Sequence, residues 1–135
     1  MRKIVRTQNA PKPRGIYSQA IVADGFVFVS GQVPVNPATD ELELGDIKSQ
    51  VRRTLKNIEL VLEAAGSSLR HVVRLGVFLA DLNDFAAMNE VFQEFFRDNP
   101  PARTTVGSQL PKVKVEIDCI ARVRKNRLKR DTARA

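Results

Sequence analysis

The segment NPPARTTV, residues 99–106, separates an apolar helical pattern from a β-branched one. Two consecutive prolines end a helix, because proline lacks an N–H group and its ring clashes with the preceding turn. Residues 104–106, which follow, favour the start of a strand. Arg103 stands at this entrance, where a guanidinium is well placed to grip a planar carboxylate with two parallel hydrogen bonds. The alternative for Arg103 is an exposed surface arginine.

Two helices are predicted from apolar residues at helical spacing. The first begins after Asp46, the predicted N-cap, and ends at Gly66, which suits the left-handed region that follows a helix. The second begins near Asn83 or Asp84, and its Met and aromatic residues are typical of core packing rather than a cofactor site. The apolar stripes are Ile47, Val51, Leu55, Ile58, Leu62 and Ala65 in the first helix, and Phe85, Met88, Phe92 and Phe95 in the second.

Strands are predicted before, between and after these helices. The pair Asp24-Gly25 predicts a tight hairpin turn, and Pro34 and Pro37 mark a long loop up to Gly45. The run at 72–79 has an unbroken apolar end, which indicates burial on both faces. The predicted strands are residues 3–6, 17–22, 26–30, 72–79, 104–108 and 113–123.

This order of elements predicts an α+β domain in which two helices cover one face of a mixed sheet. In the last strand, alternate residues from Val113 to Ala121 are apolar or small and suit the covered face. Cys119 belongs to this set and is predicted to be a small buried side chain. Glu116 and Asp118 point the other way, where an exposed sheet is ordinarily polar.

Composition indicates an ordinary soluble domain. A chain of 135 residues can bury one core, and a single cysteine with a single histidine argues against disulfides and a structural zinc site. No stretch approaches the roughly 18 apolar residues of a membrane span, and the first residues lack the apolar core of a signal peptide. A cytoplasmic location is therefore expected. His71 is predicted to be a surface residue without a Ser or Cys partner, and no phosphate loop or nucleophile elbow is present.

The net charge of +7 is concentrated at one end of the chain. Residues 122–135 contain seven Lys or Arg residues and one acidic residue, Asp131. We expect a domain over residues 1–122 and a flexible basic tail over residues 123–135. Such a tail can bind RNA phosphates, although no aromatic residue interleaves the charges as in a single-strand binder.

Nine short motifs, in order, resemble those of the RidA (YjgF/YER057c/UK114) family over about residues 3–122. The resemblance implies a chorismate-mutase-like fold whose uncovered sheet faces pack together in a homotrimer, with a site in each of three clefts between subunits. It also implies hydrolysis of enamines and imines of 2-keto acids, such as 2-aminoacrylate and 2-iminobutanoate, to the keto acid and ammonia, without cofactor or metal. The motifs are YSQA at 17–20, VSGQVP at 29–34, GDI at 45–47, NI at 57–58, LEAAG at 62–66, DLNDF at 81–85, MN at 88–89, PAR at 101–103 and VEI at 115–117.

The same resemblance implies the roles of the site residues. Arg103 matches the arginine that clamps the substrate carboxylate, and Glu116 matches the glutamate that positions and activates the attacking water. The backbone carbonyl at Thr105 would face the imine nitrogen. Other positions that line or lie near the cleft correspond to Tyr17, Gly31 and Asn89.

Two departures from the family pattern bear on this site. Ile16 precedes Tyr17 where the family usually has proline, which predicts a looser loop. Residues 106–113 look one residue short on each side of Leu110-Pro111, and a one-residue slip would turn Glu116 to the wrong face. The alternation of the last strand still places Glu116 with Asp118, away from the core.

Two other functions stay open at this point. The first is a non-catalytic member of the same fold that binds a small carboxylate or a partner protein in the cleft. The second is an RNA-associated protein that acts through its basic tail.

Overall fold

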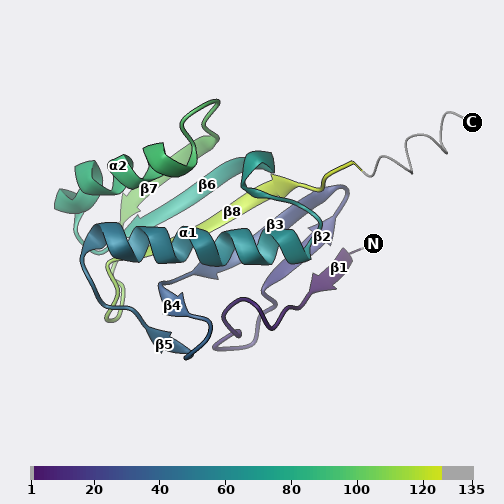
Figure 1. Ribbon diagram of the computed structural model, residues 1–135, viewed down its shortest axis with the longest axis horizontal. Helices are drawn as coiled ribbons and strands as arrows, with labels where there is room; N and C mark the ends of the chain where they lie inside the picture. The colour runs from purple at the N-terminus through teal and green to yellow at the C-terminus, as the bar shows by residue number, and fades with distance from the viewer. Residues whose placement is uncertain (1, 126–135) are drawn as a thin grey trace, which may run out of the picture.

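Six strands form one mixed sheet, and both α-helices lie against the same face of it (Figure 1). The strand order is β1-β2-β3-β8-β6-β7, and every neighbouring pair is antiparallel except β6 and β7, which are parallel. This computed structural model describes residues 2–125. The sheet consists of β1 (Arg2–Val5), β2 (Ala20–Ala23), β3 (Phe26–Gln32), β6 (Val72–Leu79), β7 (Ala102–Gly107) and β8 (Val115–Arg122).

The helices are α1 (Ile47–Ala64) and α2 (Phe85–Phe95), with short 3-10 turns η1 (Leu69–His71) and η2 (Leu82–Asp84) before β6 and α2. The carboxylate of Asp46 accepts the N–H of Ser49 at 2.8 Å, which confirms the predicted N-cap. Gly66 has a φ of 78°, so the chain leaves α1 in the predicted left-handed conformation. The apolar side of α1 is buried against β3 and β8, where it forms the centre of the core.

The predicted starts of β2 and β7 are wrong, and the first of these errors has a non-local cause. β2 begins at Ala20 rather than at residue 17, because residues 18 and 19 are held in a loop by Ser30. The Ser30 hydroxyl donates to the carbonyl of Ser18 at 2.6 Å, and the Ser30 N–H donates to the carbonyl of Gln19 at 3.0 Å. β7 begins at Ala102, two residues before the prediction, so Arg103 lies inside the strand.

Other strand boundaries also differ from the prediction. β3 continues through Gly31 to Gln32, and β8 begins at Val115, which leaves Val113 buried but outside the strand. The long loop after β3 contains a short unpredicted hairpin, β4 (Val35–Asn36) and β5 (Glu41–Leu42). The amide of Asn57 on α1 holds this hairpin by donating to the carbonyls of Val33 and Val35.

The two faces of the sheet differ as the alternation in β8 predicts. Val115, Ile117, Cys119 and Ala121 are buried under the helices, and the residues between them point to the opposite, bare face. Across four adjacent strands, the register places an apolar row on that bare face. Its members are Ile4, Ile21, Phe28 and Ile120. Phe28 remains 44% exposed, so no element of residues 2–125 covers this row.

No helix within residues 2–125 combines the length and the apolar character that crossing a membrane requires. Of the predicted basic tail, residues 126–135 lie outside the described residues, so its predicted flexibility stays a prediction.

Candidate functional site

Arg103 leaves the sheet on the face that the helices cover. In the parallel pairing of β6 and β7 it stands beside Leu75, which is buried on that face. Its guanidinium carbon lies over the rings of Phe92 and Phe85, 5.0 Å and 5.5 Å from their centroids. Within residues 2–125 its side chain has no acidic partner and no hydrogen bond. Burial lowers the pKa of Arg103, since no neighbouring carboxylate offsets the lost hydration.

The prediction that Phe85 belongs to the core is wrong. Met88 and Phe92 are buried as predicted, but Phe85 is 42% exposed at the first residue of α2. Its ring is turned toward the guanidinium of Arg103 instead. Helical spacing identified the side of α2 on which Phe85 lies, but nothing in that spacing indicated the arginine.

A hollow between α2 and the start of β7 surrounds this arginine, and we call it the arginine hollow. No Asp or Glu is among its lining residues. Thr105 lies on the same face two residues further along β7, and its hydroxyl oxygen is buried without a hydrogen-bond partner in the described chain. This hydroxyl therefore needs a hydrogen-bond partner that the described chain does not supply. The residues that line the arginine hollow are Leu75, Asn89, Phe92, Gln93, Phe96, Arg97, Pro100, Pro101 and Arg103.

Glu116 leaves the sheet on the bare face. It is half-buried on β8 opposite Phe78, and its carboxylate lies against Gly31 of β3, where a Cβ atom would overlap its Oε2. Asp118 is arranged similarly against Gly76 on the same face. Burial raises the pKa of Glu116, and the negative charge of Asp118 raises it further. The absence of a side chain at Gly31 therefore gives the Glu116 carboxylate its place.

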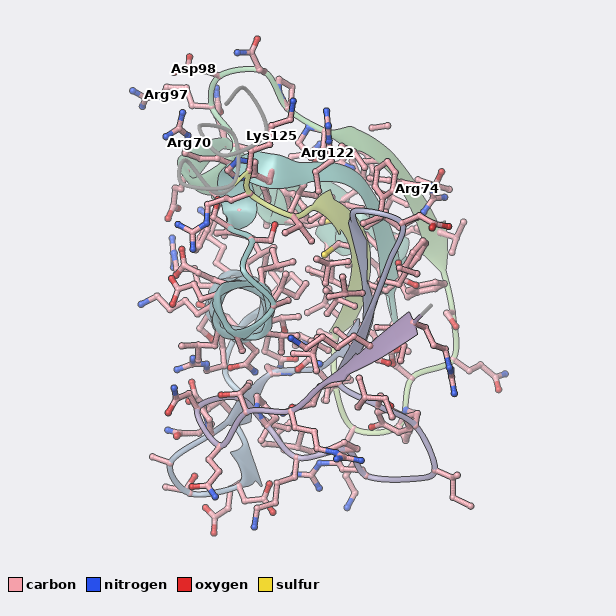
Figure 2. All side chains as sticks on the ribbon, turned by 90° about the vertical axis from the view of Figure 1, so that its right-hand side faces the viewer. Arg70, Arg74, Arg97, Asp98, Arg122 and Lys125 are labelled. Carbon is pink, nitrogen blue, oxygen red and sulfur yellow. The ribbon has the colours of Figure 1, made fainter. Side chains whose placement is uncertain are left out.

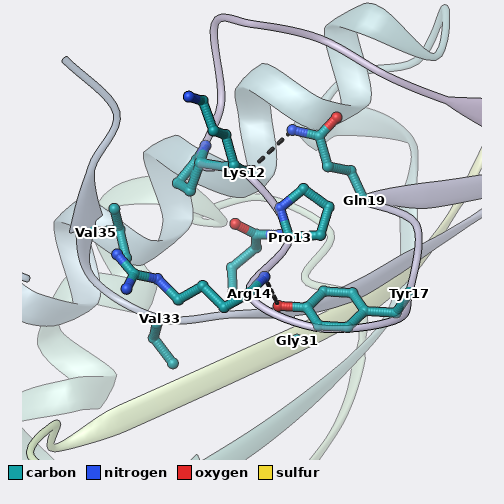
Figure 3. A pocket seen from close by; sticks show the side chains of 10 residues that line it. Lys12, Pro13, Arg14, Tyr17, Gln19, Gly31, Val33 and Val35 are labelled. Atoms are coloured by element: carbon teal, nitrogen blue, oxygen red, sulfur yellow. Dashed lines mark hydrogen bonds between the residues drawn. The ribbon is translucent and has the colours of Figure 1, made fainter. Parts of the chain in front are cut away.

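Tyr17 and Gly31 line a second, smaller hollow, together with Pro13, Arg14, Gln32 and Val33 (Figure 3). We call it the tyrosine hollow. The Tyr17 oxygen accepts the backbone N–H of Arg14 at 2.9 Å, so its own proton is free to be donated.

The loop that carries Tyr17 is tied down despite Ile16. Gln19 accepts the N–H of Thr7 at 2.8 Å and donates to the carbonyl of Pro11 at 2.9 Å. Thr7, Pro11 and Gln19 all lie in the connection between β1 and β2, so these bonds from a buried side chain brace that loop internally. The predicted loosening by Ile16 is not evident in these contacts.

The structure therefore sorts the predicted site residues into two groups. Arg103, Asn89 and Thr105 lie on the helix-covered side. Glu116 lies on the bare face against Gly31, and Gly31 shares the tyrosine hollow with Tyr17. One protomer does not bring Arg103 and Glu116 into one pocket.

The remaining reactive side chains form no site of their own in the described chain. The thiol of Cys119 is buried as predicted, and burial raises its pKa to about 12. His71 is half-buried rather than fully exposed, and its Nδ1 lies 2.7 Å from the hydroxyl of Ser68, a partner that the sequence did not indicate. Within residues 2–125 no three His, Cys, Asp or Glu side chains gather as metal ligands.

Several cations gather at the end of the domain where the chain continues into the basic tail. Figure 2 shows Arg70, Arg97, Arg122 and Lys125 at this end, with Asp98 beside Arg97. Arg122, Arg124 and Lys125 line a shallow hollow there with His71. The hollow that His71 lines shares no residue with the two described above, whereas Arg97 also lines the arginine hollow.

Residues 7–123 match the family described as Endoribonuclease L-PSP. The chain is 53% identical to a RutC family protein of Pyrococcus horikoshii, over 90% of this chain and 98% of that protein. It is 40% identical to a 2-iminobutanoate/2-iminopropanoate deaminase of Dermatophagoides farinae, over 88% of this chain and 94% of that protein.

Solved structures agree with these relatives. The yeast protein YEO7 superposes with a TM-score of 0.89 at 38% identity, covering 92% of this chain and all of that one. TdcF of Escherichia coli, crystallised with bound serine, superposes with a TM-score of 0.84 at 42% identity, covering 91% of this chain and 99% of that one.

Proposed function

Because this chain belongs to the Endoribonuclease L-PSP family, the family of the RutC and RidA proteins, we propose that it hydrolyses imines and enamines of 2-keto acids. Substrates of the 2-iminobutanoate and 2-iminopropanoate class release the keto acid and ammonia. The observation that carries the proposal is the arginine hollow, in which a partly desolvated guanidinium has no acidic partner in the described chain. A relative named for this reaction and a neighbour with bound serine, itself a 2-amino carboxylate, support the choice of substrate.

The proposed site is formed between two copies of the chain. Glu116 of one protomer faces the arginine hollow of the next, and the bare sheet faces pack together in a homotrimer. The apolar row of Ile4, Ile21, Phe28 and Ile120 supports this packing, because a solvated sheet face is ordinarily polar. The charges support it as well, because Arg103 lacks an anion and Glu116 lacks a cation within residues 2–125.

In the proposed reaction, Arg103 holds the substrate carboxylate and Glu116 takes a proton from a water molecule. The water oxygen bonds to the imine carbon, the electron pair of the C=N π bond moves to nitrogen, and the nitrogen takes the proton that Glu116 received. The resulting carbinolamine transfers its hydroxyl proton to nitrogen, and the C=O bond of the keto acid forms as the C–N bond breaks to release ammonia. The backbone carbonyl of Thr105 faces that nitrogen. One water is consumed for each ammonia formed, and no electron transfer is involved. General-base help of this kind contributes roughly 10²–10⁴-fold, and fixing the substrate adds to it.

Replacing Arg103 tests the clamp. We expect Arg103→Ala to lower kcat/KM for freshly generated 2-iminopropanoate by roughly 30- to 5,000-fold, because losing one partner of a desolvated charge pair costs about 2–5 kcal/mol. Arg103→Lys should restore little, since an ammonium cannot form two parallel in-plane hydrogen bonds. Stopped-flow measurement of imine loss gives the rate.

Full turnover by Arg103→Ala would refute the clamp. A wild-type protein that binds 2-oxobutanoate but leaves the imine intact would favour the non-catalytic carboxylate binder. Sedimentation analysis of the same samples tests the homotrimer, and a monomer that hydrolyses the imine would contradict the two-copy site.

A second candidate function, RNA binding through phosphates, is favoured by the cationic end of the domain. Arg122, Arg124 and Lys125 lead directly into the basic tail. We expect a salt-dependent affinity for single-stranded RNA that is lost on deletion of residues 124–135 while imine hydrolysis is kept. RNA affinity that survives this deletion would exclude the tail as the binding element.

A further inference from the structure

Arg103 is held by aromatic rings instead of by a carboxylate. Its guanidinium carbon lies 5.0 Å from the ring centroid of Phe92 and 5.5 Å from that of Phe85. Both rings come from α2, and within residues 2–125 no Asp or Glu forms an ion pair with Arg103. An aromatic face attracts a cation that lies over it. The rings therefore compensate in part for the hydration that Arg103 loses on burial.

The aromatic neighbours of Arg103 determine which part of its guanidinium is available to bind a ligand. All five N–H groups of a guanidinium lie in its plane, whereas a ring that stacks on it occupies a face of that plane. An Asp or Glu partner would occupy the in-plane donors that a ligand carboxylate needs. Aromatic contacts leave these donors free and still restrict the side chain, which lowers the entropy lost when a ligand binds.

The two rings contribute differently to the fold. Phe92 is 6% exposed and stacks on Phe96, so its removal would open a cavity in the core. Phe85 is 42% exposed and does not belong to the buried core, although it begins α2. The contact with Arg103 gives this exposed ring a role that core packing does not.

We infer that Phe85 is a positioning residue, whose ring holds the guanidinium of Arg103 so that its in-plane N–H groups face the carboxylate of the ligand. The inference rests on the proposed function for the identity of that carboxylate. Phe85 takes no part in the chemical step, and its replacement affects ligand binding only through the position of Arg103.

The test compares Phe85→Leu, which removes the aromatic face, with Phe85→Tyr, which keeps it. Calorimetry with 2-oxobutanoate gives a Kd that does not depend on turnover, and KM and kcat for 2-iminopropanoate are measured separately. We expect Phe85→Leu to raise both Kd and KM by about 10-fold, within the range of a partly desolvated cation–π contact. Its kcat should stay within about 2-fold, and Phe85→Tyr should match the wild type in all three quantities.

Leu82→Ala is the matched control, because Leu82 is a 57% exposed apolar residue just before α2 that is not part of the arginine hollow. It should leave Kd and KM unchanged, and thermal melting should show that all variants remain folded. An unchanged Kd in Phe85→Leu, or a Phe85→Tyr as weak as Phe85→Leu, would overturn the inference.

The same measurements separate this inference from the proposed function. If the wild type binds 2-oxobutanoate without hydrolysing the imine, and Phe85→Leu weakens that binding, the proposed reaction is refuted and the positioning role of Phe85 is kept. If the wild type hydrolyses the imine and Phe85→Leu leaves KM unchanged, only the positioning role of Phe85 is refuted. A wild-type protein that binds no keto acid would overturn both.

Discussion

The surroundings of Arg103 and of Glu116 differ in how they hold the charged group. Arg103 lies on the edge strand β7 under α2, where two aromatic rings hold it. Glu116 lies on the inner strand β8, on the face that no helix covers, where the missing side chain of Gly31 makes room for its carboxylate. One group is a cation without an anion and the other is an anion without a cation, among the described residues.

This difference teaches how the proposed site avoids neutralising itself within one protomer. If Arg103 and Glu116 shared a pocket in a single chain, they would be able to pair with each other before copies of the chain assemble. In the proposed two-copy site, their placement on opposite faces of one sheet keeps them apart within each protomer. Burial within a single protomer already lowers the pKa of Arg103 and raises the pKa of Glu116, so both charges are partly desolvated before a ligand arrives.

The sharpest way to break this comparison is to mix two inactive variants. Arg103→Ala and Glu116→Gln should each lower imine hydrolysis by about 30-fold or more. In trimers co-assembled from equal amounts of the two, about a quarter of the clefts combine a native Arg103 with a native Glu116 from the neighbouring copy. We therefore expect about a quarter of the wild-type activity.

A mixture of the wild type with the Arg103→Ala/Glu116→Gln double variant is the control for this experiment. About a quarter of its clefts should be active if the two residues act between copies, but about half if they act within one copy. Single variants that fail to complement each other would contradict the two-copy site.

A smaller effect should follow from filling the space at Gly31. A Cβ in Gly31→Ala overlaps Oε2 of Glu116 and displaces that carboxylate, which is the flexible end of a side chain. We expect kcat for 2-iminopropanoate to fall by about 10-fold with little change in Tm, because small misplacements of a reacting group are costly.

Gly76→Ala is the matched substitution, since its Cβ overlaps Oδ1 of Asp118 and leaves Glu116 in place. Its kcat should remain within about 3-fold of the wild type. Equal losses in Gly31→Ala and Gly76→Ala would show that crowding of the sheet, and not displacement of Glu116, lowers the rate.

The smallest expected effect concerns pH. Burial raises the pKa of Glu116, and the negative charge of Asp118 raises it further. Asp118→Asn removes the second cause, so the pKa of Glu116 falls and its carboxylate ionises at lower pH. The acid limb of the kcat/KM profile should therefore move to lower pH, while the rate near neutrality changes little. Asp118→Glu, which keeps the charge, should leave the limb in place, and an unmoved limb in Asp118→Asn would exclude this coupling.

Local sequence was sufficient for much of the fold. The stripe from Ile47 to Ala65, with Asp46 and Gly66 at its ends, predicts α1 to within a residue, because all of these signals act within one turn of the helix. The apolar run at 72–79 coincides with β6. The hairpin of β4 and β5 escaped prediction because its strands have only two residues each, and Asn57, more than twenty residues away along the chain, holds it by donating to the carbonyls of Val33 and Val35.

The site was only half predictable. The order of short motifs identifies Arg103 and Glu116 as candidate site residues. This identification does not require knowing which residues they contact in the fold. The contacts of Phe85 with Arg103 and of Gly31 with Glu116 join residues 18 and 85 positions apart, so no local pattern indicates them. Their effect on the proposed chemistry follows from which face of the sheet each side chain leaves.

The sequence by itself determined the helical stripes and the alternation that turns Glu116 away from the core, since both depend on a residue and its near neighbours. The tertiary structure alone decided that Arg103 leaves the opposite face, over Phe85 and Phe92. That outcome depends on the pairing of Arg103 with Leu75, across a parallel crossover that contains α2. The register of such a pairing is set by packing between segments distant in the chain, because a shift of one residue would exchange the faces of every side chain in β7.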